Sequence, residues 1–359
     1  MADISQETIT RLLRYADECH ATDLHFCVGS APLVRLNGRL EPVPGEPNVS
    51  PALVDEVVNS LLEGEKRERL ERQRSLDFSF SVPGLGRYRC NIYSQRGTYA
   101  VAMRMLPFDV PELGGLGLPE SVGNFVHKNK GLMLVVGPTG SGKSTTLASL
   151  VGAINEQYPY HILTIEDPLE YLHRHRRSLV TQREVGADTQ SFAAALREAL
   201  REDPDVILVG EMRDPETIGI ALTAAETGHL VLSTLHTAGA AKTMDRIVDS
   251  FSNEQQNQAR AQLATVLCGV ISQQLIPRLD GQGMVLASEV LVATPAVRNL
   301  IREGKHYQLN SIIQTGAAMG MQSMEMDLAR LVKEGVIAKD EALVRAQDAQ
   351  LLTQLLNRR

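Results

Sequence analysis

The sequence contains no tryptophan, few aromatic residues and no long hydrophobic run. Aromatic side chains make up 4% of its 359 residues, whereas 43% of the residues are hydrophobic, which is typical of a globular protein. No stretch reaches the roughly 18 apolar residues that span a bilayer, and the N-terminal segment lacks the apolar core of a signal peptide. The pattern predicts a soluble chain with no direct membrane insertion, so any membrane contact is expected to run through a partner.

Paired cysteines and an excess of positive charge are also missing. The four cysteines, Cys19, Cys27, Cys90 and Cys268, are scattered and form no CxxC pair. This spacing favours reduced thiols in a cytoplasmic protein over disulfides or a zinc site. The formal net charge is −7, which argues against nucleic acid as a partner, although a nucleic-acid translocase stays open as an alternative.

Residues 1–106 mix helical and strand patterns and predict a small α+β domain. Helices are expected at 4–19 and 51–72, and strands at 24–28, 32–40 (turning at Asn37-Gly38), 76–82, 87–94 and 98–106. Residues 107–119, PFDVPELGGLGLP, concentrate proline and glycine. That composition predicts a linker between two domains.

From residue 120 to residue 359 the pattern changes to alternating strands and helices. Apolar strands are expected at 132–136, 161–166, 205–210 and 230–235, a hairpin at 274–279 and 284–292, and a helical region from about 295 to 359. Helices between apolar strands predict an α/β fold with a mostly parallel sheet.

The most informative motif is GPTGSGKST, which directly follows the apolar run 132–136. It fits the phosphate-loop pattern G-x-x-x-x-G-K-[ST], in which glycine-rich backbone N–H groups surround phosphate oxygens at a helix N-terminus. Lys143 is expected to reach the β- and γ-phosphates, and the Ser144 hydroxyl to bind Mg²⁺. The predicted nucleotide-binding residues are Gly137, Pro138, Thr139, Gly140, Ser141, Gly142, Lys143, Ser144 and Thr145.

Three later segments place chemically useful side chains at strand ends. Glu166 ends one strand in TIEDPLE, where it could activate water, or it could belong to a solvated turn. Glu211 follows the strand DVILVG, where it could support Mg²⁺, directly or through water, or simply be a surface residue. His229 and His236 flank a third strand; His236 is the better candidate to contact the γ-phosphate, whereas His229 could equally be structural.

In order and approximate spacing, these segments resemble the motifs of the secretion-ATPase superfamily: Walker A, an Asp box, an atypical Walker B and a His box. Residues 21–25 (ATDLH) resemble its N-terminal signature. Residues 295–303 (PAVRNLIRE) are similar to the AIRNLIRE motif of type IV pilus retraction motors, the PilT family, with Val297 in place of isoleucine. The predicted coupling residues are Val297, Arg298, Asn299, Leu300, Ile301, Arg302 and Glu303. By helical spacing alone, this segment reads as an ordinary amphipathic helix with Val297, Leu300 and Ile301 on one side.

The resemblance implies a PAS-like N-terminal domain, a RecA-like ATPase core and a homohexameric ring. It also implies ATP and Mg²⁺ as ligands, and work on an inner-membrane pilus platform protein from the cytoplasmic side. By matching position, Glu166 would activate water, Glu211 would support Mg²⁺ or water, and His229 and His236 would couple nucleotide state to domain arrangement. Arginines from a neighbouring subunit are expected at the γ-phosphate. The candidates are Arg87, Arg89, Arg104, Arg197 and Arg201.

Other functions share part of this pattern. Pilus-assembly and secretion ATPases of type II or type IV are the nearest alternatives, but assembly relatives commonly carry a longer N-terminal region and a tetracysteine zinc element. This sequence is expected to have neither, and residues 295–303 favour retraction over type IV secretion. A nucleotide-dependent switch or scaffold without turnover is the alternative from another class; the strand-end carboxylates and the His box argue against it.

Overall fold

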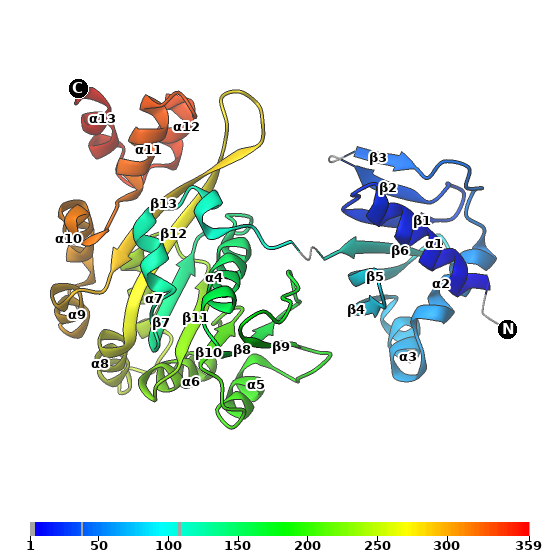
Figure 1. Ribbon diagram of the computed structural model, residues 1–359, viewed down its shortest axis with the longest axis horizontal. Coiled ribbons are helices and arrows are strands. Elements are labelled where there is room, and N and C mark those ends of the chain that lie inside the picture. Colours follow the sequence, from blue (N-terminus) through cyan, green and yellow to red (C-terminus); the bar gives the residue numbers. More distant parts are fainter. Residues whose placement is uncertain (1–3, 37–38, 107–108, 359) are drawn as a thin grey trace. The chain divides into compact units, whose positions relative to one another are not determined.

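The computed structural model describes residues 4–36, 39–106 and 109–358. The chain divides into two compact units, Met1–Phe108 and Asp109–Arg359 (Figure 1). Within the described residues, no helix combines the length and the apolar character needed to cross a membrane.

The first unit is a six-stranded antiparallel sheet with helices packed on one face. Its strand order is β3-β2-β1-β6-β5-β4. The strands are β1 (Asp23–Cys27), β2 (Leu33–Leu36), β3 (Arg39–Pro42), β4 (Ser75–Val82), β5 (Gly86–Gln95) and β6 (Thr98–Met105), and the helices are α1 (Ile4–Glu18), α2 (Pro51–Leu61) and α3 (Gly64–Gln73). Side chains that alternate toward the helices, such as Leu24, Phe26, Ile92 and Met103, form its core.

The helix predicted over residues 51–72 is two helices. Leu62 leaves helical geometry with φ −126° and ψ 127°, and its side chain is buried in the core. The chain then turns at Gly64, whose φ of +52° favours glycine. Burial of Leu62 at this break outweighs continuation of the charged helix, so the single-helix prediction is wrong. The predicted turn at Asn37-Gly38 lies outside the described residues.

The second unit has a seven-stranded sheet of order β13-β12-β7-β11-β10-β8-β9. Neighbouring strands from β12 to β9 are parallel, and only β13 at the edge is antiparallel, so the predicted α/β class is confirmed. The strands are β7 (Gly131–Val136), β8 (His161–Glu166), β9 (Leu179–Glu184), β10 (Val206–Val209), β11 (Leu230–Leu235), β12 (Leu267–Pro277) and β13 (Met284–Val292).

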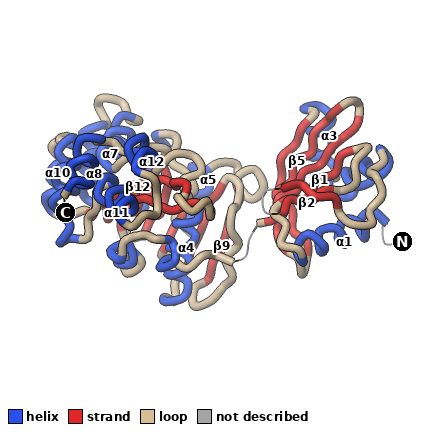
Figure 2. Tube along the Cα trace, turned by 90° about the horizontal axis from the view of Figure 1, so that it is seen from above, coloured by secondary structure: helices blue, strands red, loops and turns tan. Residues whose placement is uncertain are grey.

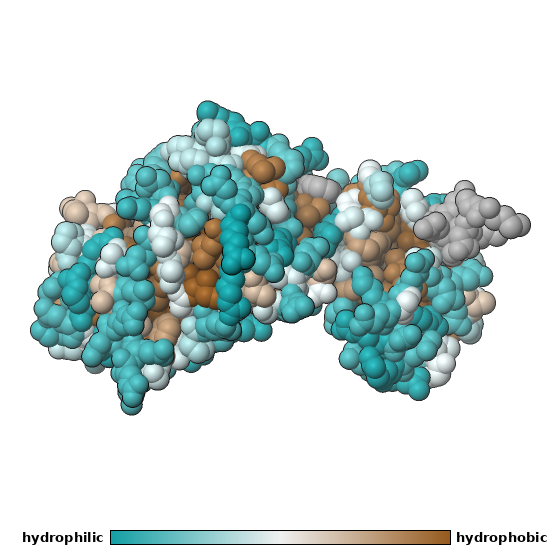
Figure 3. Space-filling view, turned by 90° about the horizontal axis from the view of Figure 1, so that it is seen from below, coloured by the Kyte–Doolittle hydropathy of each residue, from teal (hydrophilic) through white to brown (hydrophobic). Residues whose placement is uncertain are grey.

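Helices cover both faces of this sheet (Figure 2). They are α4 (Lys143–Gln157), α5 (Phe192–Ala199), α6 (Pro215–Glu226), α7 (Ala240–Asp249), α8 (Gln256–Val266), α9 (Pro295–Arg302), α10 (Leu309–Thr315), α11 (Met324–Lys333), α12 (Lys339–Arg345) and α13 (Ala349–Asn357), with the short 3₁₀ helices η1 (Leu113–Leu116), η2 (Glu120–Phe125), η3 (His306–Gln308) and η4 (Ala317–Met319). Along β7, Leu132 and Leu134 face one core cluster, and Met133 and Val135 face the other. Figure 3 shows mainly hydrophilic side chains on the visible surface of each unit, as expected when the apolar strands are buried.

Much of the segment predicted as a linker, 107–119, packs within the second unit. The Ser149 hydroxyl on α4 donates to the Pro111 carbonyl at 2.6 Å. A side chain added at Gly152 would lie 3.5 Å from Val110 Cγ1. Val110 and Pro111 of this segment therefore pack against α4.

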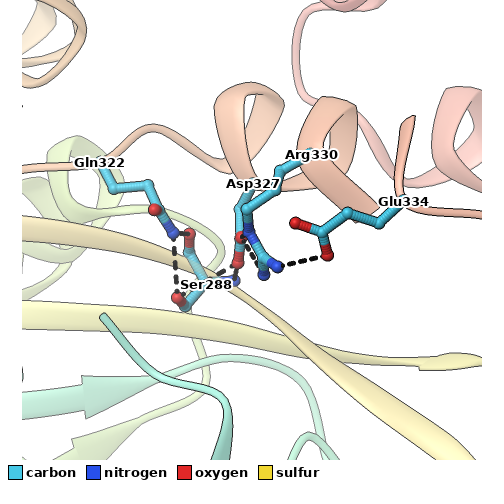
Figure 4. Close-up of polar contacts among 5 residues, drawn as sticks. All are labelled: Ser288, Gln322, Asp327, Arg330 and Glu334. Carbon is cyan, nitrogen blue, oxygen red and sulfur yellow. Dashed lines mark hydrogen bonds and ion pairs between the residues drawn. The ribbon is translucent and has the colours of Figure 1, made fainter. Parts of the chain in front are cut away.

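A buried polar network attaches the C-terminal helices to strand β13 (Figure 4). The Asp327 carboxylate on α11 accepts from Ser288 N–H at 2.8 Å and from Arg330 Nη2 at 2.7 Å. Gln322 Nε2 donates to the Ser288 carbonyl at 3.0 Å, and Arg330 also reaches Glu334 at 2.9 Å. The Asp327 side chain is 1% exposed, so this carboxylate joins α11 to the sheet at a point that water does not reach.

We expect Asp327→Ala to lower the free energy of unfolding of the second unit by about 2–4 kcal/mol, because it leaves the buried Ser288 N–H unpaired and removes one of the two carboxylate partners of Arg330. Glu334→Ala is the matched control, since it removes only the exposed end of the network; its cost should stay near 0.5 kcal/mol. Urea unfolding of both variants measures the difference. Equal losses would show that burial of Asp327 contributes nothing.

Candidate nucleotide-binding site

Residues 137–142 form a glycine-rich loop between β7 and α4. Gly140 and Gly142 have φ of +76° and +86°, which glycine adopts without strain. A Cβ at Gly137 would collide with the backbone oxygen of Gln273, whereas a Cβ at Gly140 would meet nothing within 4 Å. The loop therefore packs tightly against the sheet on one side and is open on the other, so its backbone N–H groups can approach phosphate at the start of α4.

Lys143, the first residue of α4, folds back over this loop. Its Nζ donates to the carbonyls of Gly137 at 2.9 Å and Pro138 at 3.0 Å, and the residue is only 8% exposed. Burial lowers the pKa of Lys143, while the nearby carboxylates of Glu211 and Glu170 act in the opposite direction. The ammonium group is thus held at the loop, where it can meet phosphate oxygens.

Glu211 and His236 lie together at the carboxyl ends of the adjacent strands β10 and β11. Glu211 Oε1 is 3.4 Å from His236 Nε2, and Glu211 Oε2 is 2.7 Å from Arg213 Nη2. Burial alone would raise the pKa of Glu211, but the hydrogen bond from Arg213 and the positive charges of Arg213 and Lys143 lower it on balance. Glu211 therefore presents an ionised carboxylate beside the phosphate loop, as a metal ligand or a water-orienting group would require.

Glu166 ends β8, the strand next to β10, at the same edge of the sheet. It is partly buried, and its Oε1 accepts from Thr164 Oγ1 at 2.8 Å and from Gln182 Nε2 at 3.5 Å. Burial raises the pKa of Glu166 to about 7, against the opposing effect of these hydrogen bonds. A carboxylate with a pKa near neutrality can take a proton from water at physiological pH.

His229 does not join this cluster within the chain. It precedes β11, at the opposite edge of the sheet from His236, and the strand between them spans roughly 20 Å at about 3.3 Å per residue. Its Nδ1 lies 3.0 Å from the Ala224 carbonyl, and its own carbonyl accepts from Gly131 N–H at 3.0 Å. Within the chain, these contacts join α6, β11 and β7. The role expected for His229 in coupling nucleotide state to domain arrangement stays a prediction.

The candidate arginines fall into two groups. Arg89 and Arg104 face each other across β5 and β6 on the sheet face opposite the helices, and Arg87 lies two residues from Arg89 on that same face. Asp23 accepts from Arg104 Nε at 2.8 Å. In the second unit, Arg197 pairs with Glu216 on α6, and Arg201 is exposed just beyond α5.

The segment 295–303 forms α9, with the predicted apolar stripe. Val297 and Ile301 are fully buried, and Leu300 packs against the same cluster. Arg298 donates to the last carbonyls of α8, those of Ala264 and Thr265, which compensates unpaired groups at that helix end. Asn299 and Glu303 bond to each other at 2.8 Å, and Arg302 is exposed.

Several residues around the site were not predicted from the sequence. Gln182 and Thr164 hold Glu166, Arg213 pairs with Glu211, and Tyr171 contacts the Thr145 hydroxyl at 3.0 Å. Polar residues inside the otherwise apolar strand β8 and beside the acidic strand ends are the signals that mark them.

Comparisons with known proteins agree with this geometry. A family model described as "Type II/IV secretion system protein" matches residues 98–299. The "Twitching motility protein" of Neisseria gonorrhoeae is 48% identical over 91% of this chain and 87% of its own length. The "Type IV pilus retractation ATPase PilT" of Pseudomonas aeruginosa is 47% identical over 94% of this chain and 98% of its own length.

The crystal structure of the pilus retraction motor PilT with bound ADP is 47% identical, with a TM-score of 0.88 over 96% of this chain and 98% of that one. The chain belongs to the PilT-family type IV pilus retraction ATPases. The family's fold, an antiparallel N-terminal domain and an ATPase domain with a mixed, mainly parallel sheet, is the fold found here. The chain is accordingly an ATPase of the secretion superfamily.

Proposed function

We propose that this chain hydrolyses ATP, with Mg²⁺ as cofactor, to power type IV pilus retraction by pilin depolymerisation, and thereby twitching motility. The observation that carries the proposal is the convergence of the phosphate loop, Glu166, Glu211 and His236 at one edge of the sheet. Similarity to retraction ATPases over most of the chain supports the mechanical task. The proposed working form is a homohexamer that acts on an inner-membrane platform protein from the cytoplasmic side.

The phosphate loop provides the binding half of the proposed site. Lys143 would move from the loop carbonyls to the β- and γ-phosphate oxygens, and the loop N–H groups would donate to the remaining oxygens. The Ser144 hydroxyl in the first turn of α4 and the ionised Glu211, directly or through water, would hold Mg²⁺. When bound, the ion neutralises charge on the phosphates.

Glu166 provides the hydrolytic half. Thr164 and Gln182 donate to its Oε1, and the Glu170 backbone N–H also donates to the carboxylate. Held in this way, the carboxylate would accept a proton from the attacking water. His236, held beside Glu211, would contact the γ-phosphate. Arginines of a neighbouring subunit would stabilise charge that develops on the transferred group. Arg87, Arg89 and Arg104, on one face of the first unit's sheet, are the candidate donors from that unit.

Deletion of the gene in its native host tests the proposed task directly. Retraction predicts an excess of surface pili together with loss of twitching, because fibres would assemble and then not be withdrawn. The matched control is the same strain complemented with the wild-type chain, which should restore both properties. Absence of surface pili would contradict retraction and indicate an assembly ATPase, and unchanged pili would indicate a secretion system.

A further inference from the structure

Strand β12 contacts the phosphate loop through Gln273. The β12–β7 register places Ser272 beside Val136, so Gln273 lies next to the first residue of the loop. The Gln273 side chain is buried, and its Nε2 donates to the Ser141 carbonyl at 2.9 Å. A Cβ at Gly142 would lie 3.3 Å from that same Nε2. One glutamine thus contacts the far end of the loop, while its backbone packs against the near end.

The direction of the Ser141 carbonyl has a consequence for phosphate binding. In a trans peptide the C=O of one residue and the N–H of the next point in opposite directions. Because Gln273 holds the Ser141 carbonyl toward the sheet, the Gly142 N–H is directed away from the sheet, toward the open side of the loop. That N–H lies at the start of α4, where backbone donors bind phosphate.

Two buried atoms beside this hydrogen bond have no partner among the described residues, namely Ser141 Oγ and Gln273 Oε1. A flip of the Gln273 side-chain amide would not give these atoms partners, because Oε1 would then face the Ser141 carbonyl and two acceptors do not form a hydrogen bond. Unpaired buried polar groups are rare and costly. A small movement of the loop that lets the Ser141 hydroxyl donate to Gln273 Oε1 would satisfy both atoms at once.

The neighbouring residue of β12 reaches the other side of the site. Ser272 Oγ accepts from Gly239 N–H at 3.0 Å, and its cross-strand partner Glu289 accepts from Ala240 N–H at 2.7 Å. Gly239 is the N-cap of α7 and Ala240 is its first residue, shortly after His236. Consecutive residues of β12 therefore hold the phosphate loop and the segment that follows His236.

We propose that Gln273 is a positioning residue of the nucleotide site. Its amide keeps the Ser141–Gly142 peptide in the orientation that binds phosphate, and through Ser272 the same strand links the loop to the His236 segment. The role deepens the proposed ATPase function and rests on it. Gln273 does not touch the nucleotide in this scheme; it acts through the loop.

The test is calorimetric titration of the full-length chain with ADP and with AMP, which lacks the β-phosphate that the loop binds. Gln273→Met keeps the size of the side chain and removes the hydrogen-bond donor. We expect the affinity of this variant for ADP to fall about tenfold and its affinity for AMP to change by less than about threefold. Gln273→Glu places an acceptor against the Ser141 carbonyl and a negative charge near the phosphates, so ADP should weaken by about 100-fold.

Gln274→Met is the matched control, because Gln274 is the adjacent glutamine and donates to the Arg345 carbonyl, away from the loop. The affinity of the Gln274→Met variant for ADP should stay within about twofold of wild type. Equal weakening of ADP and AMP by Gln273→Met, or no weakening at all, would overturn the proposal. If Gln273→Met fails to fold, Gln273→Asn and Gln273→Glu are compared instead, by the ratio of their affinities for ADP and AMP. A wild-type chain that binds no ADP would instead overturn the proposed function.

Discussion

Lys143→Ala is expected to reduce steady-state ATP turnover by about 10²–10³-fold, the loss that follows removal of one preorganised charge-stabilising donor. Lys143 is buried, and two carbonyls hold its ammonium group at the loop. Its removal also takes away a positive charge that lowers the pKa of Glu211. A coupled assay of phosphate release measures the effect.

Lys130→Ala is the control for this variant. Lys130 precedes β7 at the amino end of the same strand and is exposed, so its removal changes the net charge equally without touching the site. Its turnover should match wild type within about twofold. Intact turnover in Lys143→Ala would contradict the motor function as a whole, because a phosphate loop without its lysine cannot stabilise the transferred phosphate.

The parts of the fold that the sequence predicts well are those where burial decides. Residues 132–136 are a continuous apolar run and residues 230–235 are mostly apolar, because parallel strands are covered on both faces. Strand β9 was not predicted because it lies at the sheet edge, where Gln182 and Arg183 are polar and only partly buried. The sequence pattern also fails to predict the helix break at Leu62, because the burial of Leu62 depends on tertiary packing, which helix propensity does not include.

The residues of the site likewise fall into those that the sequence predicts and those that it does not. Glu166, Glu211 and His236 each follow or end a parallel strand, and the carboxyl ends of parallel strands share one edge, so their meeting was predictable. The same reasoning places His229 at the other edge, since it precedes its strand. Gln273 could not be assigned from the sequence, because a polar residue in an apolar strand reveals its partner only when the loop beside it is seen.

Glu166→Gln is expected to lower the ATP turnover number by about 10²–10⁴-fold while ADP affinity stays within about threefold. The amide keeps the size of the side chain and can still accept from Thr164, but it cannot take a proton from water. Glu156→Gln is the control, because Glu156 is an exposed carboxylate on α4 that pairs with Arg176, and its turnover should change by less than about threefold. Loss of nucleotide binding in Glu166→Gln would contradict its role as base.

The pH dependence separates this role from a structural one. A base must be ionised, so wild-type turnover should rise with pH through about 7 and level off above it. The contribution of Glu166 to the free energy of unfolding should instead become less favourable as the pH rises. The pKa of Glu166 rises from 4.5 to about 7 on folding, so its ionisation costs no stability below pH 4.5, a growing amount between pH 4.5 and 7, and the full amount above pH 7.

Glu166→Gln should therefore raise the free energy of unfolding by about 1–3 kcal/mol at pH 8 and leave it unchanged at pH 4. Urea unfolding at the two pH values measures the difference. A variant that is more stable yet unable to turn over ATP would show that the chain keeps a poorly solvated carboxylate at this strand end because hydrolysis requires it. Equal stability at both pH values would mean that Glu166 is solvated, with an ordinary pKa, and the proton would then have to be taken by another group.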